Sequence, residues 1–508
     1  MKKIVPVVTL LSFLFSFVLC GTYAYAAPPD FGGGVNNEYE YEEVVFVNGV
    51  PIKFTGSGKN VSIKVTEKED SRTVAYRLKL TSTDPDYPGE LNRSVTYKTT
   101  LSKHSDKGQT TAQMEVEKFS EKIQIGSDRY ELSDYQFSRS DIIDNRPASD
   151  YYSGSLKARK TYVINKNQGK VTMDISGAMV GYENFWGKTE TQQLEYVISC
   201  ERIVSQEDEE GEETTSDVAW QGTVSIMATD SMTKTLKYAG NQVNLSSFSG
   251  GHSRITNQSM YSRYDYNLPR IINGQASQSR LRGTIELNLE MSPRIERLVV
   301  PKFRDVAGHW AQDDIEKLYS LDVFEGTPAF FAPDAPMTRA EFTKAIVKGA
   351  NMRASMEEQT RKTTRSRTKM PEVSPFLDVS VSSPYYEYIK DGVEKGIISG
   401  IAGKKFGPED SLTRAQAITI MIRALGFENM APTPGYRTTF VDDQAIPNWA
   451  IDSVYVAREI GLISGDASNR LNPNQVLTRA EAASMLVRFL NFLEQDLQKD
   501  YREDLVLY

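Results

Sequence analysis

Cysteine and histidine are scarce in this chain of 508 residues, which contains two cysteines and three histidines. Two cysteines exclude a disulfide-dense scaffold, a cysteine-rich zinc fold and an iron–sulfur protein. The 59 Lys+Arg against 67 Asp+Glu give a net charge of −8, and an acidic chain without a long basic tract is a poor binder of nucleic acid. The histidines are isolated, and no hydrolase, metal-binding or phosphate-loop motif occurs. We therefore expect no metal, no cofactor and no enzymatic activity.

The first 26 residues are typical of a secretory signal peptide. Lys2 and Lys3 precede an apolar run that ends at Cys20, and small residues around Ala26 mark a cleavage site. The run is shorter than the roughly 20 residues that a membrane span requires. We therefore expect a secreted protein that has no transmembrane segment after cleavage. Residues 27–40, rich in Pro, Gly, Asn and Glu, predict a flexible leader.

Between 41 and 300 the apolar residues alternate with polar ones, which is the pattern of half-buried β-strands. The stretch 74–80 shows this alternation, and Asn48-Gly49 between two apolar runs indicates a hairpin. We predict an all-β region of antiparallel strands, as a sandwich, a barrel or an elongated meander. A break near 141–152 would allow a division into two domains. The acidic run 207–213 predicts a solvated loop.

From residue 303 the pattern changes to helices, and it repeats three times. Each repeat opens with Phe-x-Asp, continues through a glycine and a proline, and ends with Thr-Arg-Ala-Glu or Thr-Arg-Ala-Gln before an amphipathic helix. Thr-x-x-Glu is the capping box that starts a helix. A unit of this size cannot bury its apolar face alone, so we expect the three to pack together. The predicted segments are the repeats 303–352, 376–427 and 440–493, a basic linker 353–373 and a C-terminal tail 494–508.

An arginine occupies the first helical position after each capping threonine. A cation at a helix start is unfavourable by roughly 0.3–1 kcal/mol, so its threefold recurrence predicts a counter-anion. A guanidinium beside free backbone N–H groups can bind a carboxylate or a phosphate. The alternative is a partner within the same domain, namely the acid that opens a repeat. The arginines are Arg339, Arg414 and Arg479, and the acids are Asp305, Asp378 and Asp442.

This repeated motif, over about 303–492, strongly resembles the S-layer homology (SLH) family. The resemblance implies an all-α, pseudo-trimeric module of helix–loop–helix repeats that binds pyruvylated secondary cell-wall polysaccharide without a covalent bond. It also implies that the three arginines and the three opening acids belong to the binding site. Further family positions map onto the tryptophans Trp310 and Trp449 and the loop glycines Gly326, Gly400 and Gly465. Pro384 replaces the second tryptophan and Gln416 the second glutamate, so the third repeat matches the family pattern best.

The sequence thus predicts a multidomain bacterial cell-surface protein that is anchored to the cell wall. We expect the β-rich region to face outward as a structural component of a surface layer, with self-association as a further partner interaction. A wall-anchored adhesin or carbohydrate-binding protein is one alternative. A wall-anchored polysaccharide-active enzyme is another, because paired carboxylates for glycoside hydrolysis are brought together in space and not in sequence.

Overall fold

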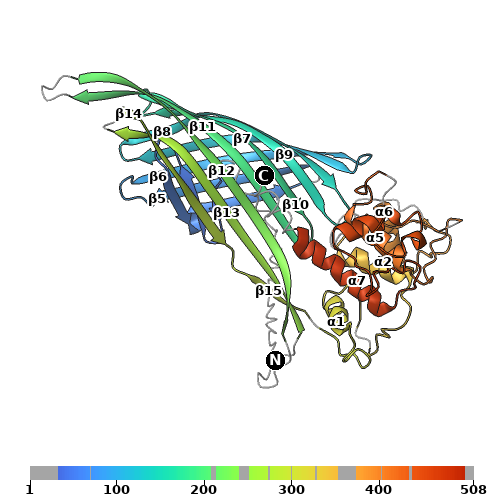
Figure 1. The fold of residues 1–508 in the computed structure, drawn as a ribbon. Coiled ribbons are helices and arrows are strands. Elements are labelled where there is room, and N and C mark those ends of the chain that lie inside the picture. The colour runs from blue at the N-terminus through green and yellow to red at the C-terminus, as the bar shows by residue number, and fades with distance from the viewer. Residues whose placement is uncertain are drawn as a thin grey trace, which may run out of the picture.

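A computed structural model describes residues 33–68, 70–207, 213–239, 251–272, 275–298, 300–326, 329–352, 373–401, 403–433 and 437–497. The predicted signal peptide, nearly all of the basic linker, the middle of the acidic run and the tail from 498 lie outside these residues. Long strands lie side by side in one extended sheet, and the helices gather at one end of it (Figure 1).

Among the described residues, the N-terminal part is an antiparallel sheet of 15 strands in which nearly every strand pairs with the next one along the chain. Two strands leave this order, because β4 pairs with β5 and β15 pairs with β13. The strands are β1 (Val35–Asn36), β2 (Glu40–Val45), β3 (Ile52–Ser57), β4 (Val61–Glu67), β5 (Ser71–Ser82), β6 (Gly89–His104), β7 (Gln109–Ile125), β8 (Asp128–Asn145), β9 (Asp150–Ile164), β10 (Gly169–Glu183), β11 (Gly187–Glu207), β12 (Glu213–Ala239), β13 (Gly251–Ile272), β14 (Gln275–Glu290) and β15 (Arg294–Leu298).

The sheet curls round until its first strand meets its late strands. The Asn36 backbone N–H contacts Met260 Sδ at 3.3 Å, and the Tyr264 hydroxyl donates to the Gly33 carbonyl at 2.7 Å. One face of most strands is thereby enclosed, as the alternation predicts, whereas β4 and β15 contain no buried residue. Two expectations are corrected here. The end of the supposed flexible leader forms β1, and β8 pairs with β9 throughout the supposed break at 141–152, because the turn between Asn145 and Asp150 is a hairpin within one sheet.

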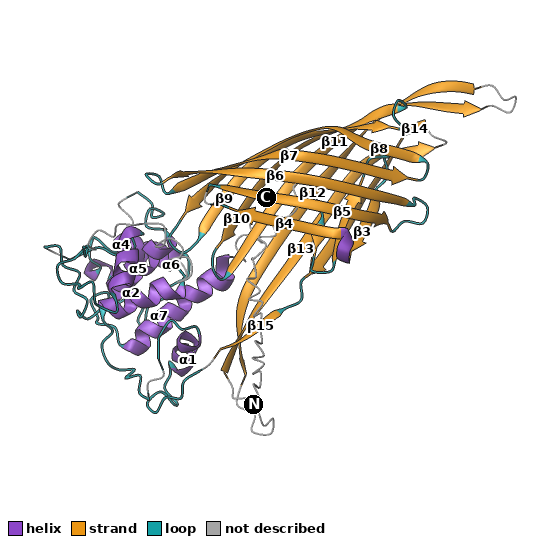
Figure 2. Ribbon diagram, turned by 180° about the vertical axis from the view of Figure 1, so that it is seen from behind, coloured by secondary structure: helices purple, strands orange, loops and turns teal. Residues whose placement is uncertain are grey.

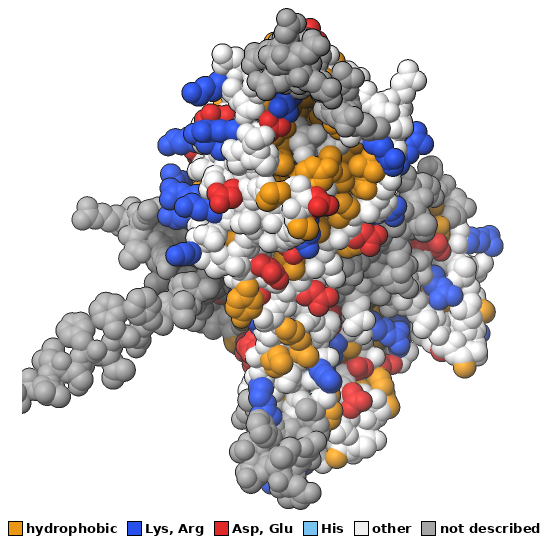
Figure 3. Space-filling view, turned by 90° about the vertical axis from the view of Figure 1, so that its left-hand side faces the viewer, with side chains coloured by type: hydrophobic (Ala, Val, Ile, Leu, Met, Phe, Trp, Pro, Cys, Tyr) orange, Lys and Arg blue, Asp and Glu red, His pale blue; other side chains and the backbone are white. Residues whose placement is uncertain are grey.

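Charged side chains are buried inside the curled sheet. Arg93 is bound by Glu43 at 2.6 Å and by Glu121 at 2.7 Å, and Lys160 lies 3.4 Å from Glu121. Burial acts to raise the pKa of Glu121, but the charges of Arg93 and Lys160 and a hydrogen bond from Tyr162 lower it to about 2. Each buried charge in this cluster therefore depends on its neighbours. From the end opposite to the helices, hydrophobic side chains gather in one area among charged and polar ones (Figure 3).

Helices form the C-terminal part, and helices of different repeats pack against one another. They are α1 (Gln312–Ser320), α2 (Arg339–Gly349), α4 (Tyr386–Glu394), α5 (Arg414–Leu425), α6 (Ile451–Glu459) and α7 (Arg479–Asn491), with a π-helical turn η3 (Phe492–Asp496) and a short 3₁₀ turn η2 (Asp443–Ala445). A second 3₁₀ turn, η1 (Gly58–Asn60), lies between β3 and β4 of the sheet. The first helix of each repeat contacts the second helix of another repeat: α1 contacts α7, α4 contacts α2, and α6 contacts α5. One apolar core therefore spans all three repeats. No helix within the described ranges is long and apolar enough to cross a membrane.

The end of the sheet is docked on the helices (Figure 2). The Trp186 ring is 2% exposed and belongs to the same apolar core as the repeats, and its Nε1 donates to the Gly349 carbonyl at 3.1 Å. The Ala148 N–H donates to the Ala424 carbonyl at 2.9 Å, and Asn184 donates to the Leu493 carbonyl at 3.1 Å. The two parts therefore share buried apolar and polar contacts.

Candidate functional site

The three repeat helices begin at the capping boxes that the sequence predicts. The hydroxyls of Thr338, Thr413 and Thr478 each accept a hydrogen bond from the backbone N–H three residues later, and the side chain of that residue accepts one from the threonine N–H. The glutamine of the second repeat forms this box as the two glutamates do. The local sequence is therefore sufficient to place an arginine at the first position of α2, α5 and α7.

Backbone groups at these helix starts are bonded to a neighbouring repeat. The N–H of Arg339 donates to the carbonyl of Asp410 at 3.0 Å, that of Arg414 to Gln475 at 3.0 Å, and that of Arg479 to Ala335 at 2.8 Å. The next residue of each helix donates to a proline carbonyl of the same neighbour. The expectation of free backbone N–H groups for an anion is therefore wrong at these positions, and an anion would have to be held by side chains.

Two of the three arginines pair with a glutamate of another repeat. Arg414 Nη2 lies 2.9 Å from Glu481 Oε1, and Arg479 Nη1 lies 2.5 Å from Glu341 Oε1. Both glutamates are the capping-box residues of their own helices. The partner is thus an acid within the helical part, but it is not the opening aspartate that the sequence suggested. These partly exposed side chains lie at the boundary between two repeats, where 22–24% of each remains accessible to solvent.

Arg339 is in a different environment, because Gln416 occupies the place of the glutamate in its neighbouring repeat. Arg339 donates to the carbonyls of Phe406 at 3.0 Å and Ser399 at 3.3 Å, and its guanidinium lies 4.8 Å from the centre of the Phe406 ring. It is 6% exposed, and burial lowers its pKa despite the opposing charges of Asp410 and Asp378. An arginine stays charged under these conditions. Within the described residues, no carboxylate lies within ion-pair distance of Arg339.

The opening aspartates hold loops of their own repeats. The Asp305 carboxylate accepts the N–H groups of Phe331 and Ala332. Asp378 accepts those of Phe406 and Gly407, both at 2.8 Å, and Asp442 accepts two equivalent ones at 2.8 and 2.7 Å. Burial acts to raise the pKa of Asp305 and Asp378, and these backbone hydrogen bonds lower it below the ordinary value. Asp378 and Asp305 thus fix the loops whose Phe406 and Phe331 rings lie against Arg339 and Arg479.

The remaining sequence-predicted positions divide into exposed rings and tight loops. Trp310 is 66% exposed and Trp449 is 55% exposed, so each of these two side chains is accessible to a ligand. Gly326 has a φ of +89°, a conformation that favours glycine. A side chain at Gly400 would meet the Phe376 ring at 2.8 Å, and one at Gly465 would meet Asn469 at 2.8 Å. The three glycines are thus required by the conformation and close packing of their loops.

Sequence reasoning missed Glu341 and Glu481 as the ion-pair partners of Arg479 and Arg414, and Gln416 as their counterpart in the second repeat. Their place in the motif was visible, but only their role as caps followed from it. The contact from one repeat to another depends on how the three helices meet. If each repeat is assumed to contact the next in a ring, Gln416 falls at the boundary that contains Arg339. The sequence would then have predicted that Arg339 lacks the glutamate partner of the other two arginines.

Three segments of the chain match the family model of the S-layer homology domain, at residues 302–343, 375–418 and 439–483. The C-terminal part of the chain therefore carries three such domains, and each of them contains one arginine of the site. No family model matches the region of the sheet.

Similar curated proteins share these repeats. The chain is 34% identical to exoglucanase XynX of Acetivibrio thermocellus over 195 residues, which are 37% of this chain and 16% of that protein. It is 33% identical to amylopullulanase of Thermoanaerobacterium thermosulfurigenes over 195 residues, 37% of this chain and 9% of that protein. It is 26% identical to the surface-layer 125 kDa protein of Lysinibacillus sphaericus over 190 residues, 37% of this chain and 14% of that protein. The chain thus spans less than a fifth of the length of these relatives.

The domains and the surface-layer relatives identify the protein as one that is attached to the cell wall or cell surface. The prediction that excluded enzymatic activity was wrong. Relatives with the same repeats are named exoglucanase, amylopullulanase, endoglucanase and endo-1,4-beta-xylanase. Their match covers at most 37% of this chain, so the names leave enzymatic activity of the chain open.

Proposed function

We propose that the three repeats form a pseudo-trimeric module that tethers the protein, without a covalent bond, to an anionic polysaccharide of the cell wall. The polymer is a secondary cell-wall polysaccharide that carries pyruvyl groups. The exported β-sheet region, delivered by the signal at 1–26, is displayed as a structural component of the cell surface. The cyclic exchange of helices and hydrogen bonds between repeats supports the trimeric arrangement.

The observation that carries the proposal is that a guanidinium recurs at every boundary between repeats. Arg339, Arg414 and Arg479 each contact the repeat that also bonds to their backbone. A guanidinium can hold a planar carboxylate through two parallel hydrogen bonds, which is the chemistry that a pyruvyl ketal requires. Exposed Trp310 and Trp449 could offer a flat apolar face to a sugar ring.

The test uses the full-length protein and purified cell walls. The wild type should sediment with the walls, and substitution of all three arginines by alanine should abolish this. Arg488→Ala is the matched control, because Arg488 is an exposed arginine of the third repeat that lies near the end of α7. Thermal unfolding must show that the triple variant is still folded.

A second arm leaves the protein unchanged and alters the wall. Chemical removal of pyruvyl groups should release the wild type, whereas mock-treated walls should retain it. Retention on depyruvylated walls would contradict the pyruvyl assignment. Sedimentation of the folded triple variant at the wild-type level would contradict the role of the arginines.

A further inference from the structure

A cavity of about 1170 Å³ lies where the sheet meets the repeats. Its walls come from turns and strand ends of the sheet, from residues 350–352 after α2, and from Lys395 after α4. Neither part alone would enclose it. The docking contacts of Trp186 and Asn184 with the helices fix these walls relative to one another. The volume exceeds the roughly 300–1,000 Å³ that is usual for small-molecule pockets, so it has room for an oligomeric ligand.

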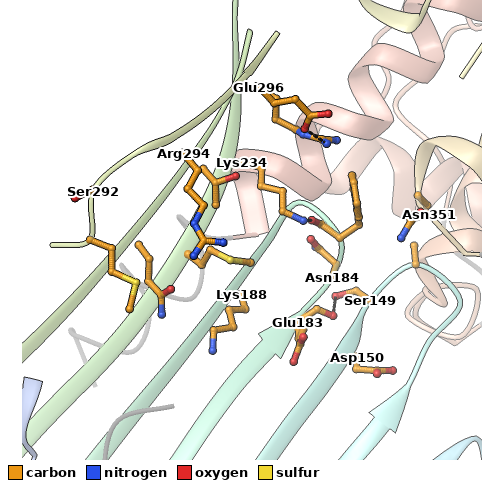
Figure 4. Close-up of a pocket in the computed structure, with 18 of the residues that line it drawn as sticks. Ser149, Asp150, Glu183, Asn184, Lys188, Lys234, Ser292, Arg294, Glu296 and Asn351 are labelled. Carbon is orange, nitrogen blue, oxygen red and sulfur yellow. Dashed lines mark hydrogen bonds and ion pairs between the residues drawn. The ribbon is translucent and has the colours of Figure 1, made fainter. Parts of the chain in front are cut away.

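Cations reach this cavity from three different strands. Arg294, Lys188 and Lys234 come from β15, β11 and β12, and Figure 4 shows Arg294 and Lys188 extending into the open space. Lys188 is 6% exposed and is neutralised by fully buried Asp230 at 2.9 Å. The charge of Lys188 is thus already balanced within the protein.

Lys234 and Arg294 are not compensated in this way. Lys234 Nζ donates to the Phe185 carbonyl and lies 3.9 Å from the centre of the Phe185 ring. Burial, followed by the charge of Arg254, lowers the pKa of Lys234 to about 8. Across the described ranges, neither Lys234 nor Arg294 has a carboxylate within ion-pair distance. An anion in the cavity would supply the missing negative charge.

The opposite side of the cavity can bond hydroxyl groups. Asp150, Glu183 and the amide of Asn351 line it, beside Asn184, whose amide is already bonded within the protein (Figure 4). Carboxylates accept hydrogen bonds from hydroxyls, and an amide can both donate and accept. The Phe185 ring is covered by Lys234 and by Arg254, whose guanidinium lies 5.5 Å from the ring centre. The lining therefore suits a ligand that carries both hydroxyls and an anionic group.

We propose that this cavity binds a short acidic oligosaccharide, and that Lys234 and Arg294 contact its anionic group. The anion is a carboxylate or a phosphate borne by a sugar. The site lies apart from the arginines of the repeats, and it does not depend on the anchoring role proposed for them.

Isothermal titration of the full-length protein tests this site with three probes: trigalacturonic acid, neutral maltotriose and inorganic phosphate. Trigalacturonic acid should bind, and maltotriose should bind at least about tenfold more weakly. Lys234→Gln and Arg294→Gln should each weaken the acidic probe by about 10- to 100-fold, since each removes one charge-assisted contact. Arg294 is exposed, so its substitution leaves the fold intact even if that of Lys234 does not. Lys98→Gln, on the outer face of β6, is the matched control.

Two further measurements separate this site from the repeats. The variant with alanine at Arg339, Arg414 and Arg479 should still bind trigalacturonic acid, and Lys234→Gln should still sediment with cell walls. No binding of the acidic trisaccharide, or binding that is unaffected by Lys234→Gln and Arg294→Gln, would overturn the proposal. Loss of binding in the arginine variant would move the site to the repeats and overturn it as well. Binding of phosphate without the trisaccharide would overturn the ligand class.

Discussion

Gln416→Glu would give Arg339 the ion-pair partner that its two counterparts already have. Gln416 is the third residue of α5 and closes the capping box there, a role that glutamate performs in α2 and α7. The new carboxylate should reach Arg339 as Glu481 reaches Arg414 at 2.9 Å. The substitution therefore changes one charge at one repeat boundary and retains the cap.

The expected effect on stability is modest. The corresponding pairs retain 22–24% of their side-chain exposure, and a pair that is partly screened by solvent contributes about 0.2–1 kcal/mol. A negative charge in the first turn of a helix adds roughly 0.3–1 kcal/mol. Together these terms predict a stabilisation of about 1 kcal/mol, measured as a shift of the midpoint of urea unfolding.

The effect on wall binding should have the opposite sign. Arg339 now lies against two carbonyls and a ring without a carboxylate, so an anionic ligand meets no competitor there. In the Gln416→Glu variant the ligand must compete with an internal carboxylate, and a pair energy of about 0.2–1 kcal/mol corresponds to an affinity that is weaker by up to about fivefold. Glu481→Gln, which releases Arg414, should conversely strengthen binding.

Binding isotherms on purified walls decide the matter, with Gln193→Glu as the control. Gln193 is an exposed residue of β11, so its substitution adds the same charge to the outer face of the sheet. Gln416→Glu should weaken binding by up to about fivefold and the control should not. Equal or tighter binding of Gln416→Glu, in a protein that is stabilised as expected, would refute the view that the lack of a carboxylate beside Arg339 favours an anion there.

Four further outcomes follow from three buried side chains and from one aspartate that holds a loop. Arg93→Met should destabilise the sheet by about 3–5 kcal/mol in urea unfolding, because it leaves buried carboxylates without their cation. The folded pKa of Glu121 is about 2, below the unfolded value of about 4.3, so its stabilisation of about 3 kcal/mol is complete above pH 4.3 and lost as the pH falls towards 2; Glu121→Gln should flatten the acid limb of a stability–pH curve. Asp378→Asn should cost about 1–3 kcal/mol in the same unfolding assay, because one backbone N–H loses its acceptor. Cys200 is 4% exposed and burial raises its pKa to about 11, so a thiol reagent should label it only after denaturant is added.

Local patterns predicted the helix starts, since Thr338, Thr413 and Thr478 cap their helices through contacts that span three residues. They also predicted the strands, because alternation marks which side chains face inward. They could not choose a topology, since the same alternation serves any antiparallel arrangement. Pro147 illustrates the difficulty: a proline-containing stretch indicated a break, yet it forms a hairpin whose Ala148 bonds to a helix of the repeats.

The position of the arginines shows how far a motif alone can be interpreted. A cation at a helix start requires a negative partner, but the motif does not show where that partner lies. In two of the three repeats the partner is the capping glutamate of another helix. The recurrence of arginine is therefore explained in part by assembly of the repeats. Arg339 lies outside this explanation, since its neighbour at 416 is neutral and its guanidinium is nonetheless buried. A buried charge is costly unless it is compensated, so the boundary that departs from the repeat pattern is the one where an external anion would gain the most.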